Sequence, residues 1–387
     1  MRGEAMRGVK TLVVKVGTAI LTDPLGAGLD RRRMEGIVEG ICWAWDKGIR
    51  TVLVSSGAIG AGMSKLGVRK RPSSLNKLQA LAAIGQGILI GSYMEMFESR
   101  GRLAAQILLT QDDFTDRRRY INAKNTIDEL LMAGITPIIN ENDAIAVEEI
   151  RFGDNDNLSA LVANMVKADL LLILSDVDGL YEADPKKDPN ANLISIVNEI
   201  TPELERISKG PGSEVGSGGM SSKVEAVKKV VLSGGMAVIA NGKLDGVIRR
   251  VLEGEEIGTL FFPKGARLTG RKRWIAFGRN PKGSITVDDG AVEAITRRGK
   301  SLLPSGVVRV DGRFGIGDLV IVRDLGGREI ARGLVNYSSE EVDRIKGHKV
   351  AEIESMLGYK YRNEVIHRDN LVLMARDHGK GEDRIGR

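Results

Sequence analysis

The 387-residue sequence predicts an α/β domain with a mostly parallel sheet sandwiched by helices, followed by a small β-rich domain. Apolar strand-like runs alternate with helical patterns between residues 11 and 241. Short strand-like runs with glycine turns follow from residue 283. A basic stretch containing glycine and proline separates the two patterns.

Six apolar runs indicate the buried strands of the first domain, because each is short, apolar and bounded by turn residues. They are TLVVKVG from Thr11, TVLVSSG from Thr51, AAQILLT from Ala104, TPIIN from Thr136, DLLLILSD from Asp169 and MAVIAN from Met236. Helical patterns such as RRRMEGIVEGICWAW and KNTIDELLMAG lie between them, and the second ends at Gly134. This alternation favours parallel strands with helical crossovers.

The second domain is predicted from GSITVDDG and SGVVRVDGRFGIGDLVIVRDLGGREIARGLVNY, which indicate closely spaced strands. We place the α/β domain at residues 1–265, a basic linker at 266–282, the β-rich domain at 283–361 and a polar tail at 362–387. The repeated MRG at the start leaves Met1 and Met6 as alternative initiation sites.

The net charge of +6 belongs to the C-terminal third of the chain. Residues 267–387 contain 24 Lys and Arg against 17 Asp and Glu, whereas residues 1–266 contain 33 against 34. A basic β-rich domain makes an RNA-binding or RNA-modification protein the alternative class of function. No aromatic pattern for stacking on bases accompanies the charge, so we expect weak, phosphate-driven RNA contact through residues 267–361 at most.

Cysteine content and hydropathy exclude other classes. Cys42 is the single cysteine, which excludes a disulfide scaffold or a cysteine-rich zinc site and fits a reducing compartment. No uninterrupted apolar run approaches the ~18 residues of a membrane span. The start, MRGEAMRGVK, lacks the apolar region of a signal peptide. We therefore expect a cytoplasmic protein without membrane contact.

Two lysines stand where their charge needs a partner. Lys15 interrupts an apolar strand, where burial is costly unless the ammonium is paired; the plainer alternative is a side chain that extends to solvent from the strand end. Lys223 falls in the first turn of a helix opened by GSGGMSSK, where the helix dipole disfavours a cation. A phosphate facing Lys223 explains this placement better than a solvated surface position does. The two lysines would serve a transferring phosphoryl group, with Asp156 available to orient them.

Three further loops have the composition of a ligand site. SSGAIGAG, from Ser55, has glycines that let backbone N–H groups approach an anion, although a structural turn explains it equally well. NENDAI and GDNDN place acid and amide side chains next to predicted core elements. Such clusters suit a polar, ammonium-bearing substrate, with helix capping and tight turns as the plainer alternatives.

The residue types of the α/β domain favour phosphoryl transfer. The three histidines, His348, His367 and His378, all lie in the C-terminal third, so most acyl-transfer triads are excluded from the first domain. A carboxylate acceptor with a pKa of about 4.3 is already ionised at neutral pH and needs no general base. The enzyme must then align two anions and stabilise their charge with lysines, backbone N–H groups and Mg²⁺.

The ordered motifs resemble those of the glutamate 5-kinase family, which has an amino-acid-kinase fold and a C-terminal PUA domain. The matching segments are VVKVGTAIL, SSGAIGAG, PIINENDAI, FGDNDNLSALVA, SDVDGLYEADP, GSGGMSSK, RKRWIAFG, GSITVDDGA, LLPSGV, GYKY and VIHRD. Each motif alone is weakly specific, but the ordered set is highly specific. Ser175 stands where threonine is familiar in the family.

The resemblance implies ATP-dependent phosphorylation of the L-glutamate γ-carboxylate to L-glutamyl 5-phosphate, the first step of proline biosynthesis. It implies Mg²⁺ carried mainly by the ATP phosphates, with no protein metal ligand. It also implies a homo-oligomer and functional coupling to γ-glutamyl phosphate reductase. Other amino-acid kinases, acting on aspartate, acetylglutamate or a nucleotide, are disfavoured by the fused β-rich domain and by NEND with GDNDN.

The same resemblance assigns roles to individual residues. The catalytic residues would be Lys15, Asp156 and Lys223. Glutamate would be held by Ser56, Asn140, Asp143 and Asn155, with Asp143 the partner of its α-ammonium. ATP would be bound by Lys15, Ser175, Asp176, Ser217, Gly218, Gly219, Met220, Ser221, Ser222 and Lys223.

Overall fold

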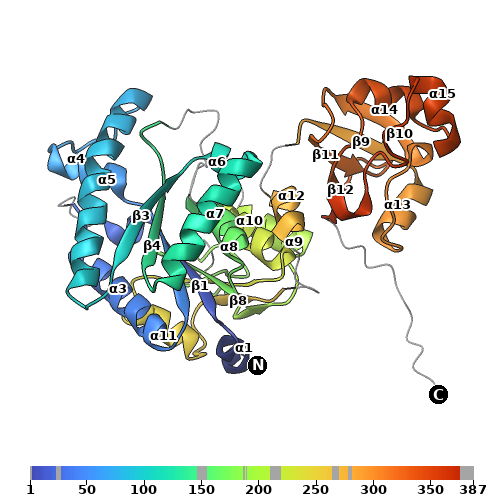
Figure 1. Cartoon of the computed structure of the whole chain (residues 1–387). Coiled ribbons are helices and arrows are strands. Elements are labelled where there is room, and N and C mark those ends of the chain that lie inside the picture. Colours follow the sequence, from blue (N-terminus) through green and yellow to red (C-terminus); the bar gives the residue numbers. More distant parts are fainter. Residues whose placement is uncertain are drawn as a thin grey trace, which may run out of the picture. The chain divides into compact units, whose positions relative to one another are not determined.

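A computed structural model of the chain describes residues 2–22, 28–145, 155–185, 188, 190–209, 219–263, 270–277 and 281–374. The chain divides into two compact units, Met1–Arg267 and Leu268–Arg387 (Figure 1). Each unit has its own sheet and its own hydrophobic core.

Over its described residues, the first unit is built on an eight-stranded sheet with the order β3-β4-β2-β1-β5-β7-β8-β6. The strands are β1 (Thr11–Val16), β2 (Arg50–Ser55), β3 (Ala104–Leu109), β4 (Thr136–Glu141), β5 (Leu170–Ser175), β6 (Ile196–Val197), β7 (Met236–Asn241) and β8 (Thr259–Phe261). The strands from β3 to β7 in this order pair in parallel, and β8 is antiparallel to β7. The prediction of a mostly parallel sheet is therefore confirmed, and each of the six predicted runs forms one of the parallel strands.

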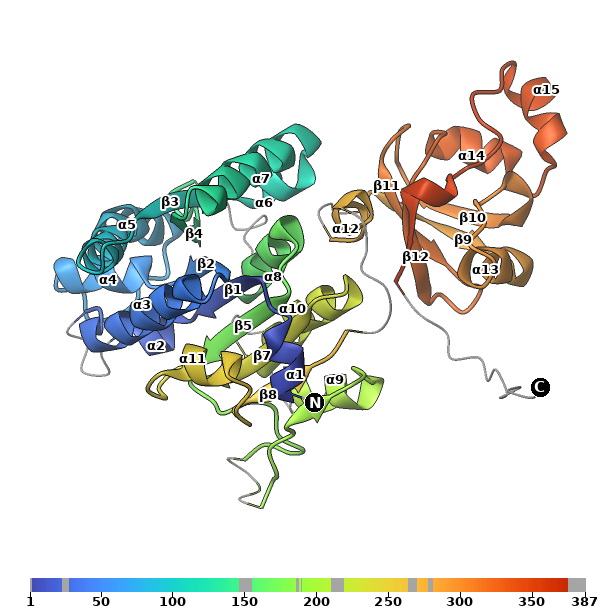
Figure 2. The same ribbon diagram turned by 60° about the horizontal axis from the view of Figure 1, so that its bottom comes forward.

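Helices cover both faces of this sheet, as Figure 2 shows. One layer contains α1 (Arg2–Arg7), α2 (Thr18–Leu21), α3 (Arg31–Asp46), α4 (Ala58–Lys65), α5 (Leu75–Glu98) and α11 (Val247–Leu252). The other contains α6 (Gln111–Thr115), α7 (Arg117–Met132), α8 (Asn155–Val166), α9 (Pro202–Lys209) and α10 (Met220–Leu232). Covering on both faces explains why every residue of β1, β4 and β5 is buried.

Helix α5 is long and apolar enough to cross a membrane by length and composition alone. It packs here as a core helix against α4, α3 and β3. Its buried stripe comprises Leu78, Leu81, Ala82, Gly85, Leu89, Ile90, Tyr93, Met96 and Phe97. A Cβ atom on Gly85 would lie 1.7 Å from the carbonyl oxygen of Ala58, so glycine at this position allows α5 to touch the backbone of α4.

The second unit has a five-stranded sheet over its described residues, with the order β10-β9-β11-β12-β13. The strands are β9 (Gly283–Val287), β10 (Val307–Gly312), β11 (Leu319–Arg323), β12 (Glu329–Leu334) and β13 (Leu371–Leu373). Only the β9–β11 pairing is parallel among them. The helices are α12 (Gly270–Phe277), α13 (Asp289–Thr296), α14 (Ser339–Ile345) and α15 (Ile353–Leu357), with short 3₁₀ turns at Pro304–Gly306, Val350–Glu352 and Arg368–Asn370. The predicted β-rich domain is present.

Two segments differ from the sequence expectation. The stretch predicted as a linker contains α12, which packs against β12 and β13 and buries Trp274, Ile275 and Ala276. The predicted tail from residue 362 instead contributes buried Val365 and Ile366 and strand β13 to the second unit. Basic and polar neighbours mask these short apolar groups in the sequence, so composition alone does not predict that they pack against the second sheet. Residues 375–387 lie outside the described residues.

Candidate active site

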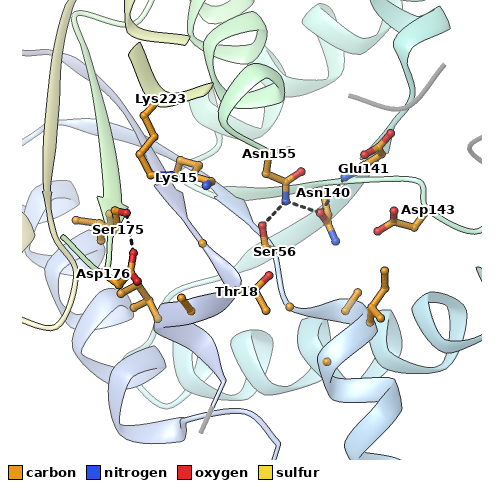
Figure 3. Close-up of a pocket in the computed structure, with 18 of the residues that line it drawn as sticks. Lys15, Thr18, Ser56, Asn140, Glu141, Asp143, Asn155, Ser175, Asp176 and Lys223 are labelled. Atoms are coloured by element: carbon orange, nitrogen blue, oxygen red, sulfur yellow. Dashed lines mark hydrogen bonds between the residues drawn. The ribbon is translucent and has the colours of Figure 1, made fainter. Parts of the chain in front are cut away.

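A cavity of about 400 Å³ opens where the carboxyl ends of β1, β2, β4 and β5 meet. Strand ends of a parallel α/β sheet are where such folds bind ligands, because loops and helix N-termini converge there. The predicted site residues that line it are Lys15, Ser56, Asn140, Asp143, Asn155, Ser175, Asp176 and Lys223. Residues from six elements or adjoining loops, far apart in the sequence, thus share one cavity (Figure 3).

Lys15, Asp156 and Lys223 form a buried charged cluster beside the cavity. Lys15 Nζ lies 2.5 Å from Asp156 Oδ1, and Lys223 Nζ lies 3.2 Å from Asp156 Oδ2. The residues are 3%, 0% and 6% exposed in chain order. Burial of these charges is tolerable because the carboxylate is shared by both ammonium groups. The three formal charges sum to +1, which favours an anion in front of the lysines.

The fold explains how these three side chains meet. Lys15 lies on β1, between β2 and β5, and α8 packs on β1 with Asp156 in its first turn. Helix α10 packs against α8 and carries Lys223 in its own first turn. The predicted alternative of a solvent-extended Lys15 is not what the structure contains.

The first turn of α10 is also linked to Asp156 through a hydroxyl. Ser222 Oγ donates to Asp156 Oδ2 at 2.8 Å and lies 2.9 Å from the Gly219 carbonyl oxygen. Gly219 is the helix N-cap and supplies no side-chain cap, while Met220 and Ser221 are half-buried in the first turn. The predicted nucleotide residues Ser217 and Gly218 lie outside the described residues.

One end of the cavity is a network of amides. Asn155 Nδ2 donates to Ser56 Oγ at 2.8 Å and to Asn140 Oδ1 at 2.9 Å. Asn140 and Asn155 are 3% and 8% exposed, and half-buried Asp143 lies at this same end (Figure 3). Hydrogen-bonded amides beside a carboxylate match a ligand that carries both carboxylate and ammonium groups.

The opposite end of the cavity holds Ser175, the last residue of β5, and Asp176, which follows it (Figure 3). Ser175 is 6% exposed, and its Oγ donates to Asp176 Oδ1 at 3.2 Å. The Asp176 side chain is exposed. Figure 3 shows Lys15 and Lys223 on the Ser175 side of the cavity and Asp143 on the other side.

Sequence reasoning missed three polar or charged residues that line the cavity: Thr18, Glu141 and Arg71. Thr18 follows β1 and Glu141 ends β4, so extending the strand-end argument by one or two residues would have found both. Arg71 belongs to the segment between α4 and α5, which has no periodic signal. Gly57 has φ +110°, a left-handed conformation that glycine allows, and it is the N-cap of α4 at the cavity wall.

Within the described ranges, no group of three or more His, Cys, Asp or Glu side chains is arranged to hold a metal ion. Asp156, the carboxylate beside the lysines, is already bonded to Lys15, Lys223 and Ser222. Both oxygens of this carboxylate are therefore occupied by protein donors.

Comparison with known proteins places both units. Residues 10–241 match the amino acid kinase family, and residues 283–357 match the PUA domain. The fold is similar to the solved structure of carbamate kinase from Giardia lamblia bound to AMP-PNP. The similarity covers 66% of this chain and 99% of that chain, with a TM-score of 0.50 and 19% sequence identity. That likeness concerns the fold alone. The two family matches therefore define an amino acid kinase with a C-terminal PUA domain.

Close relatives narrow the class further. A glutamate 5-kinase from Citrifermentans bemidjiense is 52% identical over 374 residues, covering 97% of this chain and all of the relative. A glutamate 5-kinase from Caldanaerobacter subterraneus subsp. tengcongensis is 52% identical over 365 residues, covering 94% and 98%. The chain belongs to the glutamate 5-kinase family.

Proposed function

We propose that this protein transfers the γ-phosphoryl group of MgATP to the γ-carboxylate of L-glutamate, forming L-glutamyl 5-phosphate and ADP as the first step of proline biosynthesis in the cytoplasm. The observation that carries the proposal is the buried Lys15–Asp156–Lys223 cluster beside a cavity with an amide-lined end. The identity of the relatives supports the same reaction.

In the proposed reaction, a γ-carboxylate oxygen forms a bond to the γ-phosphorus while the bond to the β,γ-bridging oxygen breaks and its electrons leave with ADP. The acceptor is ionised at neutral pH, so the protein need not remove a proton. Lys15 and Lys223 would stabilise the charge on the transferring phosphoryl oxygens. Asp156 would hold both ammonium groups in place before the substrates arrive.

Glutamate would occupy the end of the cavity formed by Ser56, Asn140, Asp143 and Asn155. Asp143 would pair with the α-ammonium, since it supplies a half-buried carboxylate at this end. The hydroxyl of Ser56 and the amides of Asn140 and Asn155 would fix the carboxylates by hydrogen bonds. The distance between this end of the cavity and the two lysines would determine which length of dicarboxylic amino acid the site accepts.

The nucleotide would enter from the end that holds Ser175 and Asp176, with the segment Ser217–Lys223 around its phosphates. The N-terminus of the 13-residue helix α10 contributes a favourable potential for those phosphates. Mg²⁺ would come as part of the MgATP substrate and lower the charge of the phosphates. A magnesium ion that is bound through the ATP phosphates needs no dedicated cluster of protein carboxylates.

A hydroxylamine trap tests the reaction directly, because hydroxylamine converts an acyl phosphate into a stable hydroxamate. The purified chain is incubated with MgATP and either L-glutamate, L-aspartate or N-acetyl-L-glutamate. We expect hydroxamate from L-glutamate in clear excess over the other two. Product formed only from aspartate or N-acetylglutamate would refute the proposal.

Three partner proposals accompany the activity. An acyl phosphate is readily hydrolysed, which favours functional coupling to γ-glutamyl phosphate reductase; co-incubation should raise the yield of reduced product over separate incubations.

We infer a homo-oligomer, which light scattering would test. The basic second unit would contact RNA weakly, and a binding titration against salt should show that contact disappear at physiological ionic strength.

A further inference from the structure

Gln86 reaches the glutamate end of the site from α5, a helix to which the functional assignments above give no role. Its Oε1 accepts a hydrogen bond from Asn140 Nδ2 at 2.8 Å. The side chain lines a neighbouring cavity of about 240 Å³, which shares Ala58, Glu141 and Asp143 with the site cavity. Gln86 therefore contacts Asn140, a residue of the proposed glutamate site, without lining the site cavity itself.

Gln86 is the outer member of a directed chain of hydrogen bonds. Asn140 gives its Nδ2 hydrogen to Gln86, while its Oδ1 accepts from Asn155 Nδ2 and from the Glu141 backbone N–H, each at 2.9 Å. Asn155 Nδ2 then donates its other hydrogen to Ser56 Oγ at 2.8 Å. The chain joins α5, β4, α8 and the loop after β2.

The direction of this chain fixes which end of each amide faces which neighbour. A reversed Asn140 amide would turn its NH₂ group toward two donors and its oxygen toward the oxygen of Gln86. Donors would then face donors, and the acceptor would face an acceptor. The Glu141 backbone N–H, which can only donate, fixes this Asn140 orientation, and Gln86 stabilises it by accepting from the nitrogen side.

The packing of α5 holds Gln86 at the required distance. The preceding residue, Gly85, lies so close to α4 that an added Cβ would be 1.7 Å from the Ala58 oxygen and 2.4 Å from the Gly62 nitrogen. Further along the helix, the Tyr93 hydroxyl lies 3.0 Å from Ser55 Oγ, at the end of β2. Backbone contact and hydrogen bond together fix α5 against the strand ends.

We propose that Gln86 is a positioning residue of the glutamate site, acting through Asn140 to set the amide orientations that receive the substrate. The inference rests on the proposed function and deepens it. Loss of the Gln86 acceptor leaves the Nδ2 group of a 3%-exposed asparagine without this partner. Asn140 then gains freedom to rotate. The free-energy cost of ordering its side chain on binding weakens the affinity for glutamate.

The test uses the full-length chain and separate titrations of the two substrates. Gln86→Met keeps an unbranched side chain of similar length but removes the amide oxygen. We expect the glutamate KM to rise about tenfold, with kcat and the ATP KM within about twofold of wild type. Gln86→Glu keeps an oxygen that can accept from Asn140 and should recover most of the glutamate affinity. Gln106→Met is the matched control, because Gln106 lines the same neighbouring cavity and, among the described residues, makes no hydrogen bond to Asn140.

A double-mutant cycle decides whether the effect passes through Asn140. In an Asn140→Ala background, Gln86→Met should add less than about a twofold further rise in the glutamate KM from rates and in the glutamate Kd from calorimetry. Additive effects, or an equal rise in the ATP KM, would overturn the positioning role. An unchanged glutamate KM in Gln86→Met would also overturn it while leaving the reaction intact. A wild-type chain that fails to phosphorylate L-glutamate would instead refute the proposed function and this inference together.

Discussion

Lys15 Nζ and Asp156 Oδ1 lie 2.5 Å apart, and their side chains are only 4% and 0% exposed. One comes from a central strand and the other from the first turn of a helix packed on it. The pair therefore fixes an ammonium group at the cavity wall without solvent to reorganise around it. Such preorganised charge is what stabilises a transferring phosphoryl group at little further cost.

Replacing Lys223 should mainly slow the chemical step. Lys223→Ala removes one of the two cations proposed to face the phosphoryl oxygens, so kcat should fall about 10³-fold, with the glutamate KM changed less than about threefold. Steady-state rates with each substrate varied measure both quantities. Lys228→Ala on the same helix is the control, because Lys228 pairs with Glu205 away from the cavity. A loss confined to KM would make Lys223 a ground-state binding residue.

Asp156→Asn should destabilise the fold as well as the activity. The amide has no negative charge for the buried ammonium groups of Lys15 and Lys223, and breaking a buried ion pair costs about 3–5 kcal/mol. Urea unfolding of wild type and variant measures the difference in the free energy of unfolding. Equal stability of the two proteins would show that other partners hold the lysines and would remove Asp156 from the organising role.

Stability should fall at alkaline pH because of Tyr93. Complete burial raises the pKa of the Tyr93 hydroxyl well above its ordinary value of about 10, despite the hydrogen bond to Ser55. The folded state therefore keeps the proton while the unfolded chain loses it, so this contribution to stability is complete below pH 10 and declines as pH rises above 10. Unfolding titrations between pH 9 and about 11 should show a smaller decline in Tyr93→Phe than in wild type. Parallel declines in the two proteins would contradict the assignment.

Much of the fold was predictable because its signals are local. Each parallel strand is a short apolar run, and Lys15 and Lys223 are conspicuous because a charge at a buried strand or helix start conflicts with its surroundings. A conflict of that kind marks a residue whose partner lies elsewhere in the sequence. The partner relationships themselves, such as the contact of Asp156 with both lysines, depend on packing between β1, α8 and α10.

The parts that the sequence did not reveal depend on long-range contacts. Gln86 is one of several polar residues on α5, and nothing near it in sequence indicates that it faces Asn140. Likewise, β13 is a strand because Leu371–Leu373 pair with β12, about forty residues earlier, and α12 is ordered by its contact with both strands. Neither segment carries a strong local pattern, so composition predicts a linker and a polar tail instead.

Two glycine substitutions in α5 should have opposite effects. Gly91→Ala adds a Cβ with no atom within 4 Å, so it should stabilise the protein by up to about 1 kcal/mol through the better helix propensity of alanine. Gly85→Ala would place its Cβ 1.7 Å from the Ala58 oxygen, which forces α5 away from α4 and should cost about 3 kcal/mol or more. The displacement should also raise the glutamate KM, because Gln86 moves with the helix and Ala58 adjoins the Ser56 loop. Urea unfolding and glutamate titration of both variants test this; equal behaviour of the two would show that the α4–α5 contact does not position the site.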